Sequence, residues 1–176
     1  MTRLTFFPAI AATALLLSSA ALAQEATAFA AMKGVDGKEL GTVSFAQTKS
    51  GMLRIVVEMT GIPPGQHGFH VHEKGACDPA SKFATAGAHY SGGKEHGVEH
   101  QGGPHAGDLP NINVGQDGIL KAEFFTGTLS ISNGENPLMD ADGSSVIIHA
   151  GADDHTTQPG GDAGDRIACG LVQQPS

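Results

Sequence analysis

Nine histidines dominate the part of this 176-residue sequence that could do chemistry. The stretch GQHGFHVHEKGAC, residues 65–77, contains His67, His70 and His72. If this stretch forms a β-strand, alternate side chains share a face, so His70 and His72 point the same way, about 7 Å apart along the strand. His67 then points to the other side. Two imidazoles on one face can converge on a single metal ion.

A second stretch, AHYSGGKEHGVEHQGGPHAGD at residues 88–108, is richer still in histidine and ends on an aspartate. Its candidate ligands are His89, His96, His100, His105 and Asp108. Histidine-rich segments of this kind commonly bind metal. His149 follows the apolar run SVII and adds one more imidazole. Together these residues predict a metal cluster rather than histidines scattered over a surface.

The donor types narrow the choice of metal. Imidazole nitrogens without thiolates suit copper and zinc, and copper heads the divalent affinity order. Three histidines with one aspartate would make a closed tetrahedral zinc site of the structural kind. All-imidazole coordination accepts both oxidation states of copper and so permits one-electron cycling. The spacing by itself leaves open how the ligands divide between two sites.

Short β-type runs must position these residues, because the sequence has no long amphipathic helix pattern. Seven runs alternate in polarity or are apolar, and turn residues separate them. They span residues 27–34, 39–48, 52–60, 66–73, 118–132, 144–150 and 166–172. This spacing predicts an all-β fold, an antiparallel Greek-key sandwich or barrel of about eight strands. Two long connections, about 73–111 and 150–165, are long enough to be functional or disordered.

The first 23 residues have the layout of a secretory signal peptide. Arg3 precedes an apolar run that closes on Ala21, Leu22 and Ala23, an A-x-A cleavage site. A membrane anchor is the alternative, but the run contains Pro8 and is short for a span. We therefore expect one mature domain, residues 24–176, in the periplasm or outside the cell. No later apolar segment is long enough to cross a bilayer.

Charge and cysteine content limit the function further. The formal net charge is −8, and it becomes −9 once Arg3 is removed, which excludes a nucleic-acid-binding role because no basic face could neutralise phosphates. Two cysteines are present, Cys77 and Cys169. In an exported protein an even count favours one disulfide, whereas two free thiols would be expected in the cytosol.

Four motifs taken together resemble the copper/zinc superoxide dismutases of the exported bacterial type. They are GQHGFHVHEKGAC, HAGDLPN, IIHAGADDH and GDRIACGLV, and the resemblance runs from about Thr27 to Val172. It implies two metal sites that share a bridging imidazole, that of His89. The implied copper ligands are His70, His72, His89 and His149. The implied zinc ligands are His89, His96, His105 and Asp108.

The resemblance also implies roles for residues around the metals. Asp153 matches an aspartate that hydrogen-bonds one ligand of each metal. Arg166 matches an arginine beside the copper channel, and Cys77 with Cys169 matches the family disulfide. The implied activity is conversion of superoxide to dioxygen and hydrogen peroxide, with His89 and Arg166 as the catalytic residues.

The sequence departs from the family pattern at two points. The step from His89 to His96 is one residue shorter than usual, which makes His100 a rival for His96 as zinc ligand. Asp165 lies beside Arg166, where its carboxylate could weaken the pull on an anion. Because the net charge repels superoxide, steering would need cations near the channel, and Lys74, Lys82 and Lys94 are the loop candidates.

Other functions fit the same residues less well. The main alternative is a non-catalytic periplasmic copper- and zinc-binding protein on the same fold, which would need neither a bridging histidine nor Arg166. A copper chaperone would be expected to carry a further CxxC or methionine-rich segment. Family members of bacterial origin occur as monomers and homodimers, and the sequence does not discriminate between these states.

Overall fold

The computed structural model describes residues 27–175, so the predicted signal peptide lies outside the described residues. Eight strands follow one another: β1 (Thr27–Gly34), β2 (Glu39–Gln47), β3 (Leu53–Thr60), β4 (Gly65–His72), β5 (Asp108–Val114), β6 (Ile119–Thr126), β7 (Ser145–His149) and β8 (Arg166–Gln173). Two short 3-10 turns, η1 (Pro79–Ser81) and η2 (Ala84–Ala86), lie between β4 and β5. The prediction of an all-β fold with about eight strands is confirmed. Over residues 27–175, no helix has the length and apolar character needed to span a bilayer.

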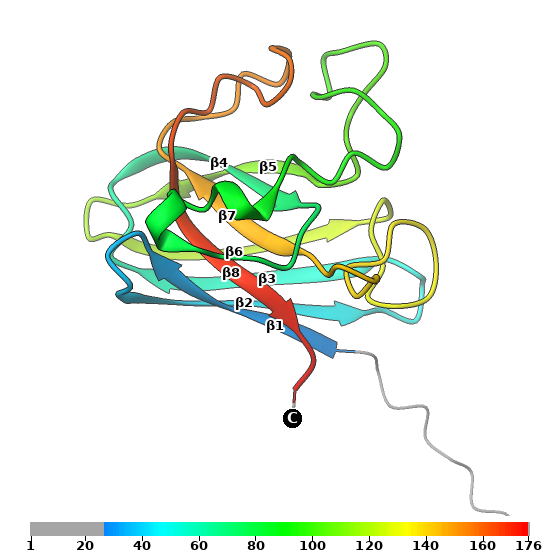
Figure 1. The fold of residues 1–176 in the computed structure, drawn as a ribbon, viewed down its shortest axis with the longest axis horizontal. Coiled ribbons are helices and arrows are strands. Elements are labelled where there is room, and N and C mark those ends of the chain that lie inside the picture. Colours follow the sequence, from blue (N-terminus) through cyan, green and yellow to red (C-terminus); the bar gives the residue numbers. More distant parts are fainter. Residues whose placement is uncertain (1–26, 176) are drawn as a thin grey trace, which may run out of the picture.

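The strands form one antiparallel sheet in the order β5-β4-β7-β8-β1-β2-β3-β6. β5 and β6, the two ends of this order, contact each other, so the sheet curls into a nearly closed barrel (Figure 1). β3 pairs with β6 and β4 with β7, the crossovers typical of a Greek key. These crossovers bring segments that are far apart in the sequence side by side.

Alternation along the strands fills the barrel with apolar side chains. In β3, Leu53, Ile55 and Val57 are fully buried, while their neighbours face outward. From β4, Phe69 and Val71 point into the same core. Each buried side chain of this size stabilises the fold by about 1.5–3 kcal/mol, so the register of every strand is strongly specified.

The outer face of β4 is buried as well, although it turns away from the core. His70 and His72 alternate with Phe69 and Val71, yet both are 0% exposed. Two connections, residues 73–107 between β4 and β5 and residues 150–165 between β7 and β8, lie on the same side of the barrel (Figure 1). A polar layer is therefore enclosed between the sheet and these loops.

A small second core attaches the first of these loops to the outside of the sheet. Phe83 and Ala86 of the loop pack against Ile147 of β7 and Cys169 of β8. A disulfide joins Cys77 to Cys169 across 92 residues of sequence, which confirms the predicted bridge. The loop is thus fixed to β8 by both apolar contact and a covalent bond.

Two predicted boundaries are wrong: the run expected over residues 118–132 forms a strand only over Ile119–Thr126, and the first long connection ends earlier than expected. The first long connection was expected to reach residue 111, but β5 begins at Asp108. Pro110 interrupts the strand pattern in the sequence and so hides this strand. It is tolerated because β5 pairs only with β4, and Pro110 lies opposite the register shift between His67 and Phe69. The second connection, residues 150–165, has the predicted bounds.

Candidate metal centre

Two groups of four side chains gather in the enclosed polar layer, and His89 belongs to both. Within each group, one potential ligand atom per residue lies within 4.8 Å of all the others. The members of the first, here called the four-histidine group, are His70, His72, His89 and His149. The members of the second, here called the aspartate group, are His89, His96, His105 and Asp108. These are the two sets that the sequence comparison with the family had suggested, and the described residues contain no other such group.

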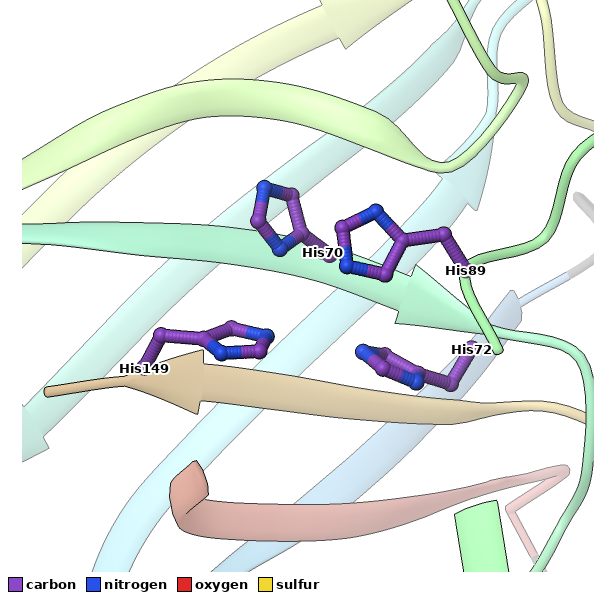
Figure 2. Close-up of side chains that lie close together, drawn as sticks. All are labelled: His70, His72, His89 and His149. Atoms are coloured by element: carbon purple, nitrogen blue, oxygen red, sulfur yellow. The ribbon is translucent and has the colours of Figure 1, made fainter. Parts of the chain in front are cut away.

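Strand pairing assembles the four-histidine group. His70 and His72 lie on β4, and His149 ends β7, the strand that pairs with β4. His89 reaches them from the loop through an isolated β-bridge to His72. The ring centroid of His70 lies 4.0 Å from that of His89 and 4.9 Å from that of His149, and the four rings surround one space (Figure 2).

The aspartate group forms around the carboxylate of Asp108, the first residue of β5. Its Oδ1 lies 3.0 Å from Nδ1 of His89 and 3.2 Å from Nδ1 of His105. Its Oδ2 accepts backbone hydrogen bonds from Gly97 and His105. Asp108 also pairs in register with His70, which places the two groups next to each other.

In His72 and His149, one ring nitrogen makes a hydrogen bond to a backbone carbonyl, which leaves the other nitrogen without a proton. Nδ1 of His72 donates to the carbonyl of Gly87 at 3.1 Å, and Nδ1 of His149 donates to the carbonyl of Gly164 at 3.1 Å. The opposite nitrogens, Nε2 of both rings, are buried and have no hydrogen-bond partner. In a neutral imidazole, when one ring nitrogen donates a hydrogen bond, the other nitrogen carries a lone pair. This unprotonated nitrogen is the one that can bind a metal.

The carboxylate of Asp153 accepts a hydrogen bond from one ring in each group and so also determines which nitrogen of that ring is unprotonated. Its Oδ2 accepts from Nε2 of His70 at 2.7 Å, and its Oδ1 accepts from Nε2 of His96 at 3.0 Å. Nδ1 of His70 and Nδ1 of His96 are then the buried nitrogens without a hydrogen bond, although Nδ1 of His96 lies 3.0 Å from Oδ2 of Asp108. Such orphaned atoms are rare in folded proteins. Four buried lone pairs of this kind, in two groups, fit two nitrogen-preferring metal ions such as copper and zinc.

Burial keeps His70, His72 and His149 neutral. The pKa of His70 falls to about 4, because desolvation and the nearby His89 together outweigh the opposing hydrogen bond to Asp153. Desolvation lowers the pKa of His149 to about 3 and that of His72 well below its usual value. Neutral imidazoles at pH 7 can bind a cation without first losing a proton.

The two aspartates are held ionised despite their burial. Desolvation alone would raise the pKa of Asp108, but hydrogen bonds from His89 and the backbone of Gly97 lower it overall. The same balance holds for Asp153, whose pKa falls through hydrogen bonds from His70 and the backbone of His155. Each aspartate therefore presents a fixed negative charge to the metal centre.

Three histidines lie outside both groups. His100 contacts the carboxylate of Glu95 at 3.0 Å and is partly exposed, so the structure brings His96 rather than its rival into the aspartate group. His67 is buried between the carbonyls of His149 and Pro63, each 2.8 Å from one ring nitrogen. His155 lies beside Asp153 and Asn111.

Sequence reasoning missed two residues that support the site. The side-chain amide of Asn111 donates to the backbone carbonyl of Asp153 at 2.8 Å, and its carbonyl accepts from the backbone of Asp153 at 2.9 Å. Gln158 makes a comparable pair of bonds with the backbone of His96. Asn111 ends the HAGDLPN motif on β5 and Gln158 lies outside the quoted motifs, but the role of each depends on a contact that only the fold brings about.

An open cavity of about 560 Å³ gives access to the centre. Its lining includes His89, His149 and Arg166. The guanidinium of Arg166 donates to the carbonyls of Phe83 and Gly87, both at 2.7 Å, and burial lowers its pKa. Among the described residues that line the cavity, Arg166 is the only cation and Asp162 is the only acid.

The predicted steering residues do not line this cavity. Lys74, Lys82 and Lys94 are exposed elsewhere on the loop between β4 and β5. Asp165 is also exposed and is not among the lining residues. The charges that an approaching anion meets at the cavity wall are therefore those of Arg166 and Asp162.

The fold and the centre define a class of protein: an antiparallel β-barrel with a paired imidazole site that suits two metal ions. Residues 39–172 match the family model of copper/zinc superoxide dismutase. The chain belongs to this family, and the predicted enzyme class, an oxidoreductase of the superoxide dismutase type, is confirmed.

Comparisons with individual proteins support this family assignment. The chain is 42% identical to a copper/zinc superoxide dismutase of Caulobacter vibrioides over 150 residues, 84% of this chain and 86% of the relative. It is 37% identical to a second such protein from Aquifex aeolicus, covering 93% of this chain and 96% of that one. A crystal structure of a superoxide dismutase-like protein from Bacillus subtilis superposes with a TM-score of 0.76 at 36% identity, covering 81% and 96% of the two chains.

Proposed function

We propose that this protein disproportionates superoxide, with copper in the four-histidine group and zinc in the aspartate group. The observation that carries the proposal is the set of four buried imidazole nitrogens that make no hydrogen bond, divided between two groups that share His89. A cavity with a single cation, Arg166, opens onto them. A site for a small anion next to a redox metal needs these parts.

Copper, when bound, supplies the one-electron chemistry: one superoxide is oxidised to dioxygen, and a second, with two protons, is reduced to hydrogen peroxide. The residues of the chain prepare this reaction. Arg166 attracts the anion to the cavity floor, where its guanidinium is oriented by two backbone carbonyls. His70, His72 and His149 remain neutral through burial, and the hydrogen bond of each ring fixes its orientation.

His89 is the residue that we assign to proton delivery. Its Nδ1 faces the aspartate group, 3.0 Å from Asp108, while Nε2 lies near Gly160 in the cavity wall. The aspartate group would hold this ring from one side, together with zinc if that ion were bound there, so the ring could accept and release a proton at Nε2 without turning. In this role it bridges the two sites and supplies a proton to the departing peroxide.

We also propose that the protein is exported. Residues 1–23 would be the signal peptide, and residues 24–176 would form the mature enzyme in the periplasm or outside the cell. The disulfide between Cys77 and Cys169 supports this location, because such bonds persist in oxidising compartments.

The test is a dismutase assay on purified protein loaded with copper and zinc, followed by pulse radiolysis. We expect rapid decay of superoxide, and a loss of at least about a hundredfold in the variant His70→Ala, which removes a ligand on β4. His100→Ala, a histidine outside both groups, is the matched control and should retain the rate. Uptake of copper in nitrogen-rich coordination without dismutation would instead support the non-catalytic metal-binding alternative.

A further inference from the structure

The side chain of Gln158 makes three hydrogen bonds that join two loops. Its Oε1 accepts from the backbone N–H of His96 at 3.0 Å. Its Nε2 donates to the carbonyl of His96 at 2.8 Å and to the carbonyl of Thr156 at 3.2 Å. These partners fix the orientation of the amide, because an N–H can only be met by the oxygen and a carbonyl only by the nitrogen.

His96 depends on contacts from outside its own loop. It is fully buried, but the segment 73–107 that carries it contains only the two short 3-10 turns. Its ring is held at Nε2 by Asp153, and its backbone is held on both sides by Gln158. Both of these residues belong to the connection between β7 and β8.

Backbone contacts next to His96 also join the two connections, residues 73–107 and 150–165. The N–H of Glu99 donates to the carbonyl of His155 at 3.2 Å. Gly97 has φ = +93°, and a Cβ at that position would lie 2.0 Å from the carbonyl oxygen of His155. The two loops therefore meet backbone to backbone beside His96, and Gln158 is the side chain that closes this junction.

We infer that Gln158 is a positioning residue for zinc binding: it holds His96 in place and links the wall of the cavity to the aspartate group. The inference rests on the proposed zinc site. Gln158 itself lines the cavity, so a movement that separates this part of the wall from residues 73–107 would break its bonds to His96. By linkage, zinc in the aspartate group then stabilises the cavity wall, and displacement of the wall promotes zinc release.

The variant Gln158→Met tests this, because it keeps the length of the side chain and removes all three hydrogen bonds. Gln158 is exposed, so no core packing is lost. We expect zinc to be released to a colorimetric chelator about tenfold faster than from the wild type, the lower end of the range for residues that orient metal ligands. The control is Gln101→Met, the same change at an exposed position of the loop between β4 and β5. This variant should release zinc at the wild-type rate.

A second measurement does not depend on metal. In the metal-free protein, hydrogen exchange at the His96 amide should be faster in Gln158→Met than in the wild type and unchanged in Gln101→Met. Equal exchange or equal zinc release in Gln158→Met and wild type would overturn the inference. If the wild type itself bound no zinc, the proposed function would fail, while the exchange experiment would still report on the link between Gln158 and His96.

Discussion

The two halves of the metal centre are built in different ways. In the four-histidine group, His70, His72 and His149 are strand residues, and the pairing of β4 with β7 sets their separation. In the aspartate group, only Asp108 lies on a strand, while His96 and His105 are carried by a loop. The sheet positions the first group by register, whereas hydrogen bonds between loops position the second. A strand register changes only if a whole strand shifts, so the first group is the more rigidly preorganised.

The electrostatics of the two halves also differ. In the four-histidine group, burial keeps His70, His72 and His149 neutral, and no member of the group is a carboxylate. The aspartate group has the ionised Asp108 at its centre. In the proposed function, copper would thus enter a preformed set of nitrogens without a carboxylate, and zinc would enter a set that contains one ionised carboxylate.

The largest expected effect of these charges is on the free energy of unfolding at acid pH. In the metal-free protein, the pKa of His70 is lowered from 6.5 to about 4 and that of His149 to about 3. Between pH 6.5 and these values the unfolded chain binds protons that the folded chain does not accept, so the free energy of unfolding falls as pH falls. His70 alone corresponds to about 3 kcal/mol.

Asp108 and Asp153 act in the same direction, but at lower pH. Their pKa values are lowered on folding, so they stabilise the folded state above pH 3.8 and lose this contribution below it. Thermal unfolding of metal-free protein as a function of pH measures both effects. His149→Gln should flatten the decline between pH 6.5 and 4, and an unchanged profile in that variant would contradict the assignment.

Removing Asp153 should affect the two halves unequally. Asp153→Ala deletes the hydrogen bonds to His70 and His96, and we expect zinc affinity to fall about 10- to 100-fold. Copper affinity should fall less, because β4 still fixes the position of His70. Competition with chelators of known affinity measures both losses, and Asp117→Ala, an exposed aspartate in the turn between β5 and β6, is the control. Equal losses at both metals would remove the distinction between register and loop positioning.

The smallest expected effect is on kcat/KM for the anion that enters the cavity. Asp162 lines the same wall as Arg166, and its negative charge opposes the attraction of superoxide. Asp162→Asn should raise kcat/KM about twofold at low ionic strength and steepen its decline with salt. Asn also tolerates the left-handed backbone at this position, φ = 50°, so the fold is preserved. Pulse radiolysis over a range of salt concentrations measures the effect, and a salt-independent rate in both proteins would exclude steering.

Local patterns in the sequence determine much of the molecule. Alternation with a period of two predicts most of the strands and places His70 and His72 on one face. The composition of the loop after β4 predicts a metal-binding segment, and the resemblance to the family names the same two groups of side chains that the structure brings together. These features need only the neighbours of each residue in the chain.

Tertiary structure decided the rest. The pairing of β4 with β7 brings His149 beside His70, the edge position of β5 lets Pro110 lie in a strand, and contacts between loops select His96 over His100. Asn111 and Gln158 acquire their roles from the same contacts. The physical reason is that each of these outcomes depends on hydrogen bonds or packing between residues distant in sequence, which no local period encodes.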